Sequence, residues 1–261
     1  MIAPATPTPH PLEALQSRVS ASRLSCFHQC RLKFFFRYVQ KVEKPTTPAL
    51  HVGTTVHAVL QAWNLARWRR EPFQQAKELF DQRWSEQVGI DWESDEEKQR
   101  QMAWSLLETR FRESPIPPDE RPEAVEVAVE ADLKRHGLPE LVGVIDLVRA
   151  GGRIVDFKTS AQTPNPGRAA HQHEVQASCY ALLYREATGR EESGIELHHL
   201  VKLKIPKLVV TPLGPMSSEQ QTRLFRVMES YLNGLSKEDF VPSPGLHCAA
   251  CEYFKECRRW C

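Results

Sequence analysis

Two short runs of β-forming residues, joined by a loop with two consecutive glycines, constrain most strongly how this chain can fold. The runs cover about 141–149 and 153–158, and the loop covers 150–152. A glycine can adopt the left-handed conformation that a three-residue hairpin loop requires, so the two runs are predicted to pair as antiparallel strands. In that register Arg149 lies opposite Arg153.

The same register predicts a cluster of charged side chains on one face of the hairpin. Asp146 lies opposite Asp156, and Lys158 points to the same face because it is two residues further along the strand. Carboxylates bind Mg²⁺ or Mn²⁺, and a lysine beside them can orient a water molecule and offset charge on phosphorus. This combination suits phosphodiester hydrolysis. The alternative is an ion pair between neighbouring strands on a solvated face.

The residues around this hairpin predict an α/β chain with a helical block before the first strand. A Pro-bearing stretch at 1–19 is expected to be a flexible tail. Apolar spacing and capping residues predict helices at about 20–38, 54–70, 73–88, 95–113, 173–188 and 217–234. Further strands are predicted at about 125–130, 195–203 and 208–211.

Composition and charge exclude several classes of protein. Hydrophobic residues make up 41% and charged residues 26%, which suits a globular chain with a core. No run approaches the ~18 apolar residues of a membrane span, and residues 1–11 lack a secretory pattern. We therefore expect a cytoplasmic protein with no membrane partner.

The sequence has no Gly-x4-Gly-Lys-Ser/Thr loop and so encodes no ATPase motor. A net charge of +1 gives no bulk argument for nucleic acid.

Three further motifs occur in a fixed order around the hairpin. His57 ends the run Gly53-Thr-Thr-Val-His57, and Gln176 and Tyr180 form Gln-x3-Tyr on the predicted helix after the lysine. The opening motif is Ser20-x-Ser22-x-Leu24-x2-Phe27-x2-Cys30. Together with the hairpin, this ordered set resembles RecB-family nucleases of the PD-(D/E)XK superfamily, including the AddB nuclease domain and the CRISPR-associated exonucleases. The resemblance covers about 20–261.

The resemblance implies a role for each matching residue. The groups that would hold the metal are His57, Asp146, Asp156 and the Phe157 carbonyl. Lys158 would be the catalytic lysine, and Gln176 and Tyr180, on one helical face, would contact DNA or steady the site. The ordinary alternative for these two is helix surface and packing. Glu126 and Glu130 share a strand face and could add an accessory carboxylate.

Four of the seven cysteines follow a separate pattern. Cys30 is far upstream of Cys248-x2-Cys251-x5-Cys257 at the C-terminus. This arrangement resembles the iron–sulfur staple of some RecB-family nucleases, which implies a [4Fe–4S] cluster. Structural Zn²⁺ is the alternative. The remaining candidates are Cys26 as a replacement first ligand, His247 as a second possible ligand, Cys179 in packing and Cys261 as a bystander.

Two basic sets and a group of tryptophans could contact nucleic acid. The basic sets are Arg31, Lys33, Arg37 and Lys41, and Lys202, Lys204 and Lys207. Either set could follow a phosphate backbone or simply be solvated. The tryptophans are Trp63, Trp68, Trp84, Trp92 and Trp104. Most are expected in the core, and one or two could stack on single-stranded bases.

These observations predict a restriction-endonuclease-like α/β domain over 20–261, with a mixed central sheet flanked by helices. Residues 54–113 would be a helical insertion that could arch over the site, and 240–261 a cluster-binding segment that closes onto Cys30. The expected function is a metal-dependent DNA nuclease, an exonuclease on single strands or free ends, in repair, recombination or DNA processing. A helicase or integrase is a possible partner. The alternatives are a non-catalytic DNA-binding subunit and an accessory factor that trims DNA.

Overall fold

The computed structural model describes residues 11–66, 74–87, 89–92 and 95–260. The chain divides into two compact units, which we call the central unit and the terminal unit. The central unit comprises Pro45–Val129 and Val144–Met216. The terminal unit comprises the residues up to Lys44, Glu130–Gly143 and Ser217 onward. Strands β2 (Ala124–Ala131) and β3 (Glu140–Arg149) span the boundaries between them.

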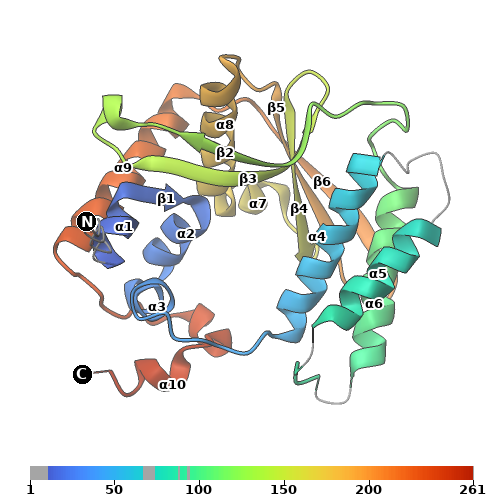
Figure 1. Ribbon diagram of the computed structural model, residues 1–261, viewed down its shortest axis with the longest axis horizontal. Helices are drawn as coiled ribbons and strands as arrows, with labels where there is room; N and C mark the ends of the chain where they lie inside the picture. Colours follow the sequence, from blue (N-terminus) through green and yellow to red (C-terminus); the bar gives the residue numbers. More distant parts are fainter. Residues whose placement is uncertain (1–10, 67–73, 88, 93–94, 261) are drawn as a thin grey trace, which may run out of the picture. The chain divides into compact units, whose positions relative to one another are not determined.

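A six-stranded mixed sheet confirms the predicted fold class. Its main path is β1-β3-β4-β5-β6, and β2 pairs with β3 (Figure 1). In the central unit the remaining strands are β4 (Arg153–Ser160), β5 (Gly194–Val201) and β6 (Lys207–Leu213). β3 and β4 are antiparallel, β4 and β5 parallel, and β5 and β6 antiparallel. The long connection between β4 and β5 contains two helices, as a parallel pair requires.

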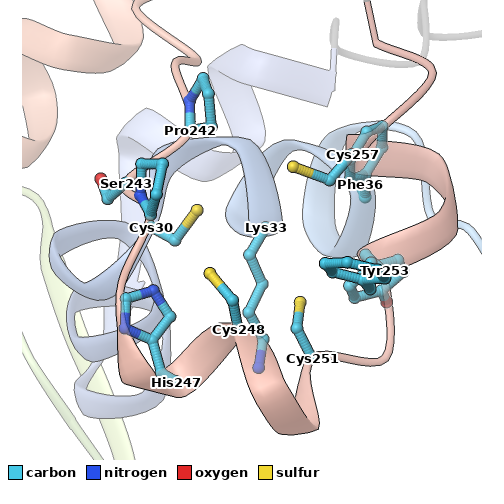
Figure 2. Close-up of a pocket in the computed structure, with 12 residues that line it drawn as sticks. Cys30, Lys33, Phe36, Pro242, Ser243, His247, Cys248, Cys251, Tyr253 and Cys257 are labelled. Atoms are coloured by element: carbon cyan, nitrogen blue, oxygen red, sulfur yellow. The ribbon is translucent and has the colours of Figure 1, made fainter.

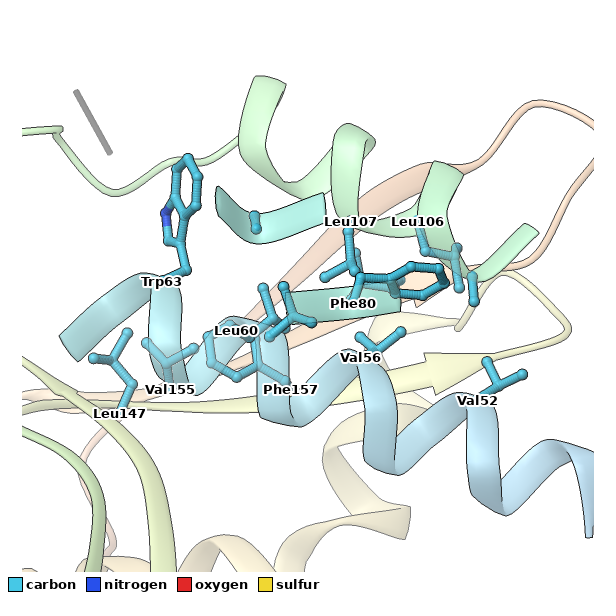
Figure 3. Packing of buried hydrophobic residues seen from close by; sticks show 14 of the residues in the cluster. Val52, Val56, Leu60, Trp63, Phe80, Leu106, Leu107, Leu147, Val155 and Phe157 are labelled. Carbon is cyan, nitrogen blue, oxygen red and sulfur yellow. The ribbon is translucent and has the colours of Figure 1, made fainter. Parts of the chain in front are cut away.

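Three helices cover one face of this part of the sheet. They are α4 (Pro48–Ala66), α5 (Gln74–Glu86) and α6 (Glu96–Arg112). Figure 3 shows Val56 and Leu60 of α4 beside Phe80 of α5 and Phe157 of β4, in one apolar cluster. The predicted helices of the 54–113 block therefore exist, and their apolar side chains pack on the sheet and on one another.

The tryptophans of this block belong to the same core. Trp63 and Trp84 are buried, and Trp92 and Trp104 are partly buried against the cluster. The rings of Trp84 and Trp92 stack with centroids 5.2 Å apart. Trp68 lies outside the described residues. The expectation that most of these rings are in the core is confirmed for the four described ones.

The opposite face of β4 meets α8 (Glu174–Thr188), and α7 (Pro166–Gln172) contacts β6 and α8. Successive side chains of a strand point to opposite faces. Phe157 packs into the α4–α6 cluster, whereas Lys158 hydrogen-bonds to Gln176 of α8. The charged residues of β4 therefore lie on the α8 face. The short helix α7, which Asn165 caps by accepting from the Arg168 N–H, was not expected from the sequence.

The terminal unit is built around aromatic rings. It contains β1 (Arg18–Ser20), η3 (Lys134–His136), the longer helices α2 (Ala21–Gln29) and α9 (Ser218–Ser236), and the short elements α1 (Pro11–Ser17), α3 (Arg31–Phe34), η1 (Phe35–Val39), η4 (Leu246–Ala250) and α10 (Phe254–Cys257). Phe27, Phe34 and Tyr231 meet edge to face in its core. β1 pairs in parallel with the first residues of β3.

Two expectations for the N-terminal region differ from the structure. Residues 11–19 were expected in a flexible tail, whereas they form α1 and the start of β1 because Leu12 and Leu15 are buried against the unit. The continuous helix expected over 20–38 is interrupted at Cys30, whose backbone is extended with φ −162° and ψ 111°. Ser20 caps the first part, as predicted, by accepting from the Arg23 N–H at 3.4 Å.

The glycine loop of the hairpin has the predicted register. Arg149 pairs with Arg153, and Gly151 and Gly152 have φ of 78° and 73°. One carboxylate oxygen of Glu123 accepts the N–H groups of both glycines at 3.0 Å. A Cβ added to Gly152 would lie 2.5 Å from the Tyr184 hydroxyl oxygen, whereas one added to Gly151 meets nothing within 4 Å.

These contacts predict that alanine at Gly152 destabilises the protein more than alanine at Gly151. Gly151→Ala should lower the free energy of unfolding by about 1–2 kcal/mol, which is the cost of a left-handed conformation for alanine. Gly152→Ala has the same conformational cost, and its Cβ also displaces Tyr184. It should therefore lower the free energy of unfolding by about 1 kcal/mol or more beyond the effect of Gly151→Ala. Urea denaturation of both variants measures this difference. Equal unfolding midpoints would contradict the proposed close contact.

Candidate active site

Two carboxylates, one buried and one largely shielded from solvent, lie where β3 and β4 stop pairing. The last paired residues are Leu147 and Val155, and Asp146 and Asp156 are the next residues outward. The N–H of Phe157 donates a 2.8 Å hydrogen bond to Oδ2 of Asp146, so the carboxylate links the two strands beyond their last backbone pair. The sequence-based pairing of Asp146 with Asp156 is thus consistent with this register.

The electrostatics of this pair are unfavourable without a cation. Burial, and then the neighbouring charge of Asp156, raise the pKa of Asp146 to about 7. The Phe157 N–H and the Lys158 ammonium act in the opposite direction. Oδ2 of Asp156 is buried and accepts no hydrogen bond, although Lys158 Nζ lies 2.9 Å away. One ammonium therefore serves two carboxylates.

Lys158 is held in a continuous chain of polar contacts. Its Nζ donates to Oδ1 of Asp156 at 3.0 Å and to Oε1 of Gln176 at 2.8 Å. The Gln176 amide then donates to the Tyr180 hydroxyl at 2.9 Å. Burial, and then the charges of Asp156 and Asp146, raise the pKa of Tyr180 well above its usual range, so it stays a neutral phenol. The Gln-x3-Tyr pair therefore positions the lysine from α8.

His57 approaches the carboxylates from α4. Its Nδ1 lies 3.7 Å from Oδ2 of Asp146. Burial lowers the pKa of His57, and its ring meets the edge of the Phe157 ring with centroids 6.3 Å apart. A neutral imidazole with a free lone pair is the form that binds metal ions. His57, Asp146, Asp156, Phe157, Lys158, Gln176 and Tyr180 are thus all close together in the central unit.

An open cavity beside His57 extends the site along α4. The residues that line it are Ala49, Leu50, Gly53, Thr54, His57, Ala58, Gln61, Glu126 and Thr159. Glu126 has a positive φ of 46°, which interrupts the alternation of β2. Glu130 is on the same strand but pairs with Arg18 in the terminal unit. The two glutamates, expected to share a face, therefore have different surroundings, and only Glu126 lines this cavity.

Two histidines beside the lysine were missed by the sequence reasoning. His199 is the β5 partner of Lys158, and it is buried. Its ring lies 5.7 Å from that of His173, which directly precedes α8. Burial lowers the pKa of both, so both are neutral near pH 7. The spacing His173-x2-Gln176-x3-Tyr180 on one helical stripe is the signal that could have identified His173.

The four cysteines of the predicted cluster site surround one cavity in the terminal unit. Figure 2 shows the sulfurs of Cys30, Cys248, Cys251 and Cys257 turned toward a common space. Burial, and then the proximity of the other three thiols, raise the pKa of Cys257. Cys26 does not line this cavity, and burial raises its pKa to about 11. The geometry therefore favours Cys30 over Cys26 as the upstream member of the set.

The other cysteine and histidine candidates have distinct environments. His247 lines the cysteine cavity, whereas Cys179 is buried inside α8, where burial raises its pKa to about 12. Cys261 lies outside the described residues. Lys33 also reaches the cavity and pairs with Glu252 at 3.1 Å. Since Arg31 pairs with Asp239, two members of the first basic set are engaged within the protein.

Comparison with known proteins identifies the family. A sequence model of the PD-(D/E)XK nuclease superfamily matches residues 18–258. The chain belongs to this superfamily. No curated protein matches it. A helix able to cross a membrane is absent from the described part of the chain.

Two solved structures are similar to this chain at low sequence identity. One, from Eubacterium rectale and provisionally named an exonuclease, has a TM-score of 0.62 and 14% identity, covering 100% of this chain and 94% of the other. A second, SSO0001, has a TM-score of 0.43 and 12% identity, covering 95% and 92%. The first supports the fold, and the nuclease family assignment comes from the sequence model.

Among the described residues, no group of three or more His, Cys, Asp and Glu side chains is arranged as a ready metal site. The donor chemistry nevertheless fits a divalent cation at Asp146 and Asp156. Asp156 is buried and the Asp146 side chain is 11% exposed. Burial, and then the charge of Asp156, raise the pKa of Asp146, and Oδ2 of Asp156 accepts no hydrogen bond. A bound divalent ion would offset the charge of both carboxylates and give Oδ2 of Asp156 a partner.

The raised pKa of Asp146 predicts a pH-dependent stability without metal. Because the folded pKa of about 7 exceeds the unfolded one, folding favours the protonated carboxyl. This contribution is fully present below about pH 4 and is lost as the pH rises through 7. In EDTA, Asp146→Asn should therefore stabilise the protein at pH 8 and not at pH 4, by at most about 4 kcal/mol at 1.4 kcal/mol per pKa unit.

Urea denaturation at the two pH values measures this difference. Mg²⁺ or Mn²⁺ should stabilise the wild type more than Asp146→Asn at pH 8, because metal binding requires the ionised carboxylate. Equal stability of the two proteins at pH 8 in EDTA would contradict the repulsion described above.

Proposed function

We propose that this nuclease is a Mg²⁺- or Mn²⁺-dependent deoxyribonuclease of RecB type. The observation that carries the proposal is the contact of Lys158 with both Asp156 and Gln176, next to a second carboxylate, Asp146, whose pKa is raised. A purely structural ion pair needs one carboxylate and has no use for a second one with a raised pKa. The ordered motifs around the hairpin support the RecB assignment.

The residues would divide the work as follows. Asp146, Asp156 and the Phe157 carbonyl would hold the metal, with His57 as a further ligand. When bound, the cation would polarise the phosphate and lower the pKa of a water molecule. Lys158 would place that water and offset negative charge on the phosphate. Gln176 would fix the direction of the lysine, and Tyr180 would fix the amide of Gln176.

Removing the central residues should abolish cleavage and preserve the fold. Asp146→Ala, Asp156→Ala and Lys158→Ala should each lose about 10³-fold or more in rate, since metal and charge stabilisation are worth several kcal/mol. Gln176→Ala should lose about 10- to 100-fold, because Lys158 keeps Asp156 as a partner. Cleavage of end-labelled DNA with Mg²⁺ or Mn²⁺ measures these rates.

The matched control is Lys98→Ala, which removes an exposed lysine of α6 whose partner is Asp95. It should cleave at the wild-type rate. Wild-type cleavage by Lys158→Ala would refute the active-site assignment. Binding of DNA by the wild type without any cleavage would favour a non-catalytic DNA-binding subunit.

We further propose that the substrate is single-stranded DNA or DNA with a free end, cut as an exonuclease. The RecB-type motifs and the exonuclease name of the Eubacterium rectale protein support this. The cavity along α4 is lined by His57, which lies 3.7 Å from Asp146, so a strand bound in it would lie beside the carboxylates. Repair, recombination or DNA processing, with a helicase or integrase partner, is the corresponding cellular context.

Linear and circular substrates distinguish the two modes of cleavage. An exonuclease should degrade linear single strands and leave covalently closed single-stranded circles intact. Digestion of both forms in parallel, resolved on denaturing gels, gives the result. Rapid linearisation of circles would show endonuclease activity, and in that case the requirement for a free end would be wrong.

We also propose that Cys30, Cys248, Cys251 and Cys257 hold a [4Fe–4S] cluster, with structural Zn²⁺ as the alternative. All four line one cavity, and their thiols are close enough to oppose one another's ionisation. Four thiolates suit either metal. The ligands would connect the chain at residue 30 with its last segment, a loop of more than 200 residues. Closing so long a loop stabilises a fold by restricting the unfolded chain.

Protein purified without oxygen should be brown, with absorption near ~400 nm from thiolate-held iron. Cys30→Ser and Cys251→Ser should remove the colour and the iron. Cys26→Ser is the matched control, since Cys26 lies one turn before Cys30 but outside the cavity. Cys179→Ser is a second control. Elemental analysis decides between the metals: one zinc and no iron per chain would refute the cluster.

A further inference from the structure

The turn between β5 and β6 presents an apolar tip between lysines. Its sequence is Lys202-Leu-Lys-Ile-Pro-Lys207, and the Ile205 side chain is 82% exposed. Among the described residues of the central unit, the next most exposed large apolar side chain is Leu65 at 59%. Exposing an isoleucine to this extent gains nothing in folding, so the tip is suited to contact another molecule.

The turn begins at the active-site end of the sheet. β4 and β5 are parallel and pair through Ser160 and Val201, and the Lys202 N–H donates to the Ser160 carbonyl at 2.8 Å. Ser160 is two residues after Lys158 on the same strand. At about 3.3 Å per residue and one strand spacing, Ile205 is within roughly 20 Å of the catalytic lysine. This is the length of about six base pairs.

Lys204 and Lys207 of the turn are available to an anionic partner, whereas Lys202 is partly buried, which lowers its pKa. Within the part of the chain that the structure describes, no carboxylate forms an ion pair with Lys202, Lys204 or Lys207. Other lysines of the protein do have such partners: Lys33 pairs with Glu252, and Lys44 with Glu256. Lys204 and Lys207 flank the tip and create a local positive charge on a protein whose net charge is only +1.

We infer that the 202–207 turn engages the end of a nucleic acid duplex and opens its terminal base pair. Lysines would contact phosphates on both sides of the tip, and the Ile205-Pro206 pair would lie against the last base pair. Isoleucine and proline are among the residues that proteins insert between bases, at a cost of a few kcal/mol per unstacked step. The separated strand could then reach Lys158. This inference rests on the proposed function, because it assumes that the active site accepts single strands.

A binding experiment without cleavage tests the inference. A blunt DNA duplex carries 2-aminopurine in its terminal base pair, and its fluorescence rises when that base unstacks. In EDTA the wild type should raise this fluorescence at saturating protein. Ile205→Ser should lose most of the rise and keep its affinity for a single strand of the same length. Lys204→Gln and Lys207→Gln should each weaken binding to both forms and reduce the salt slope of log K by about 1.

The matched control is Leu65→Ser, which removes an exposed apolar side chain of α4 and should leave the fluorescence rise unchanged. A wild type that gives no rise, or an Ile205→Ser variant that gives the full rise, would overturn the inference and assign the tip to a different partner.

The nuclease proposal is tested by a different result. Wild type that opens duplex ends in EDTA but cleaves nothing with Mg²⁺ or Mn²⁺ would refute the catalysis and retain the turn as a duplex-end contact.

Discussion

The active site depends on two like charges that lie close together at the open end of the β3–β4 hairpin. Asp146 and Asp156 repel each other, and the protein supplies a single ammonium, that of Lys158. Two contacts hold the carboxylates in place. The Phe157 N–H fixes one carboxylate, and the lysine fixes the other. A site built in this way is stable enough to form and still favours an added divalent cation.

The two faces of the sheet separate the apolar side chains of β4 from its charged ones. On β4, Val155 and Phe157 pack against the helices α4–α6, while Asp156 and Lys158 face α8. The strand's period of two residues therefore places packing and chemistry on opposite faces without any irregularity in β4. His57 is the exception among the site residues, since it comes from the apolar side and reaches Asp146 where the two strands separate.

The hairpin, its register and the ordered motifs were predictable because their causes are local. Two glycines set the turn, and the turn sets the position of Asp146 relative to Asp156. The break at Cys30 was not predictable, because the residues around it have an unbroken helical pattern. The left-handed backbone of Glu126 and the proximity of His199 to Lys158 depend on strand neighbours distant in sequence. Order at 11–19 similarly depends on burial of Leu12 and Leu15.

Helix α8 contacts the hairpin near both of its ends. Gln176 holds Lys158 near the outer end of β4, and two turns later Tyr184 lies against Gly152 and within 3.4 Å of Glu123, which binds the loop. The spacing of Gln176 and Tyr184 on the helix therefore has to match the distance between Lys158 and Gly152 on the hairpin. One residue inserted in β4 before Asp156 would turn the carboxylate into the apolar core, and one inserted between Gln176 and Tyr184 would rotate one contact by about 100° relative to the other. We therefore expect the protein to tolerate insertions and deletions outside these two spans only, and we expect an exchanged hairpin to require its own helix.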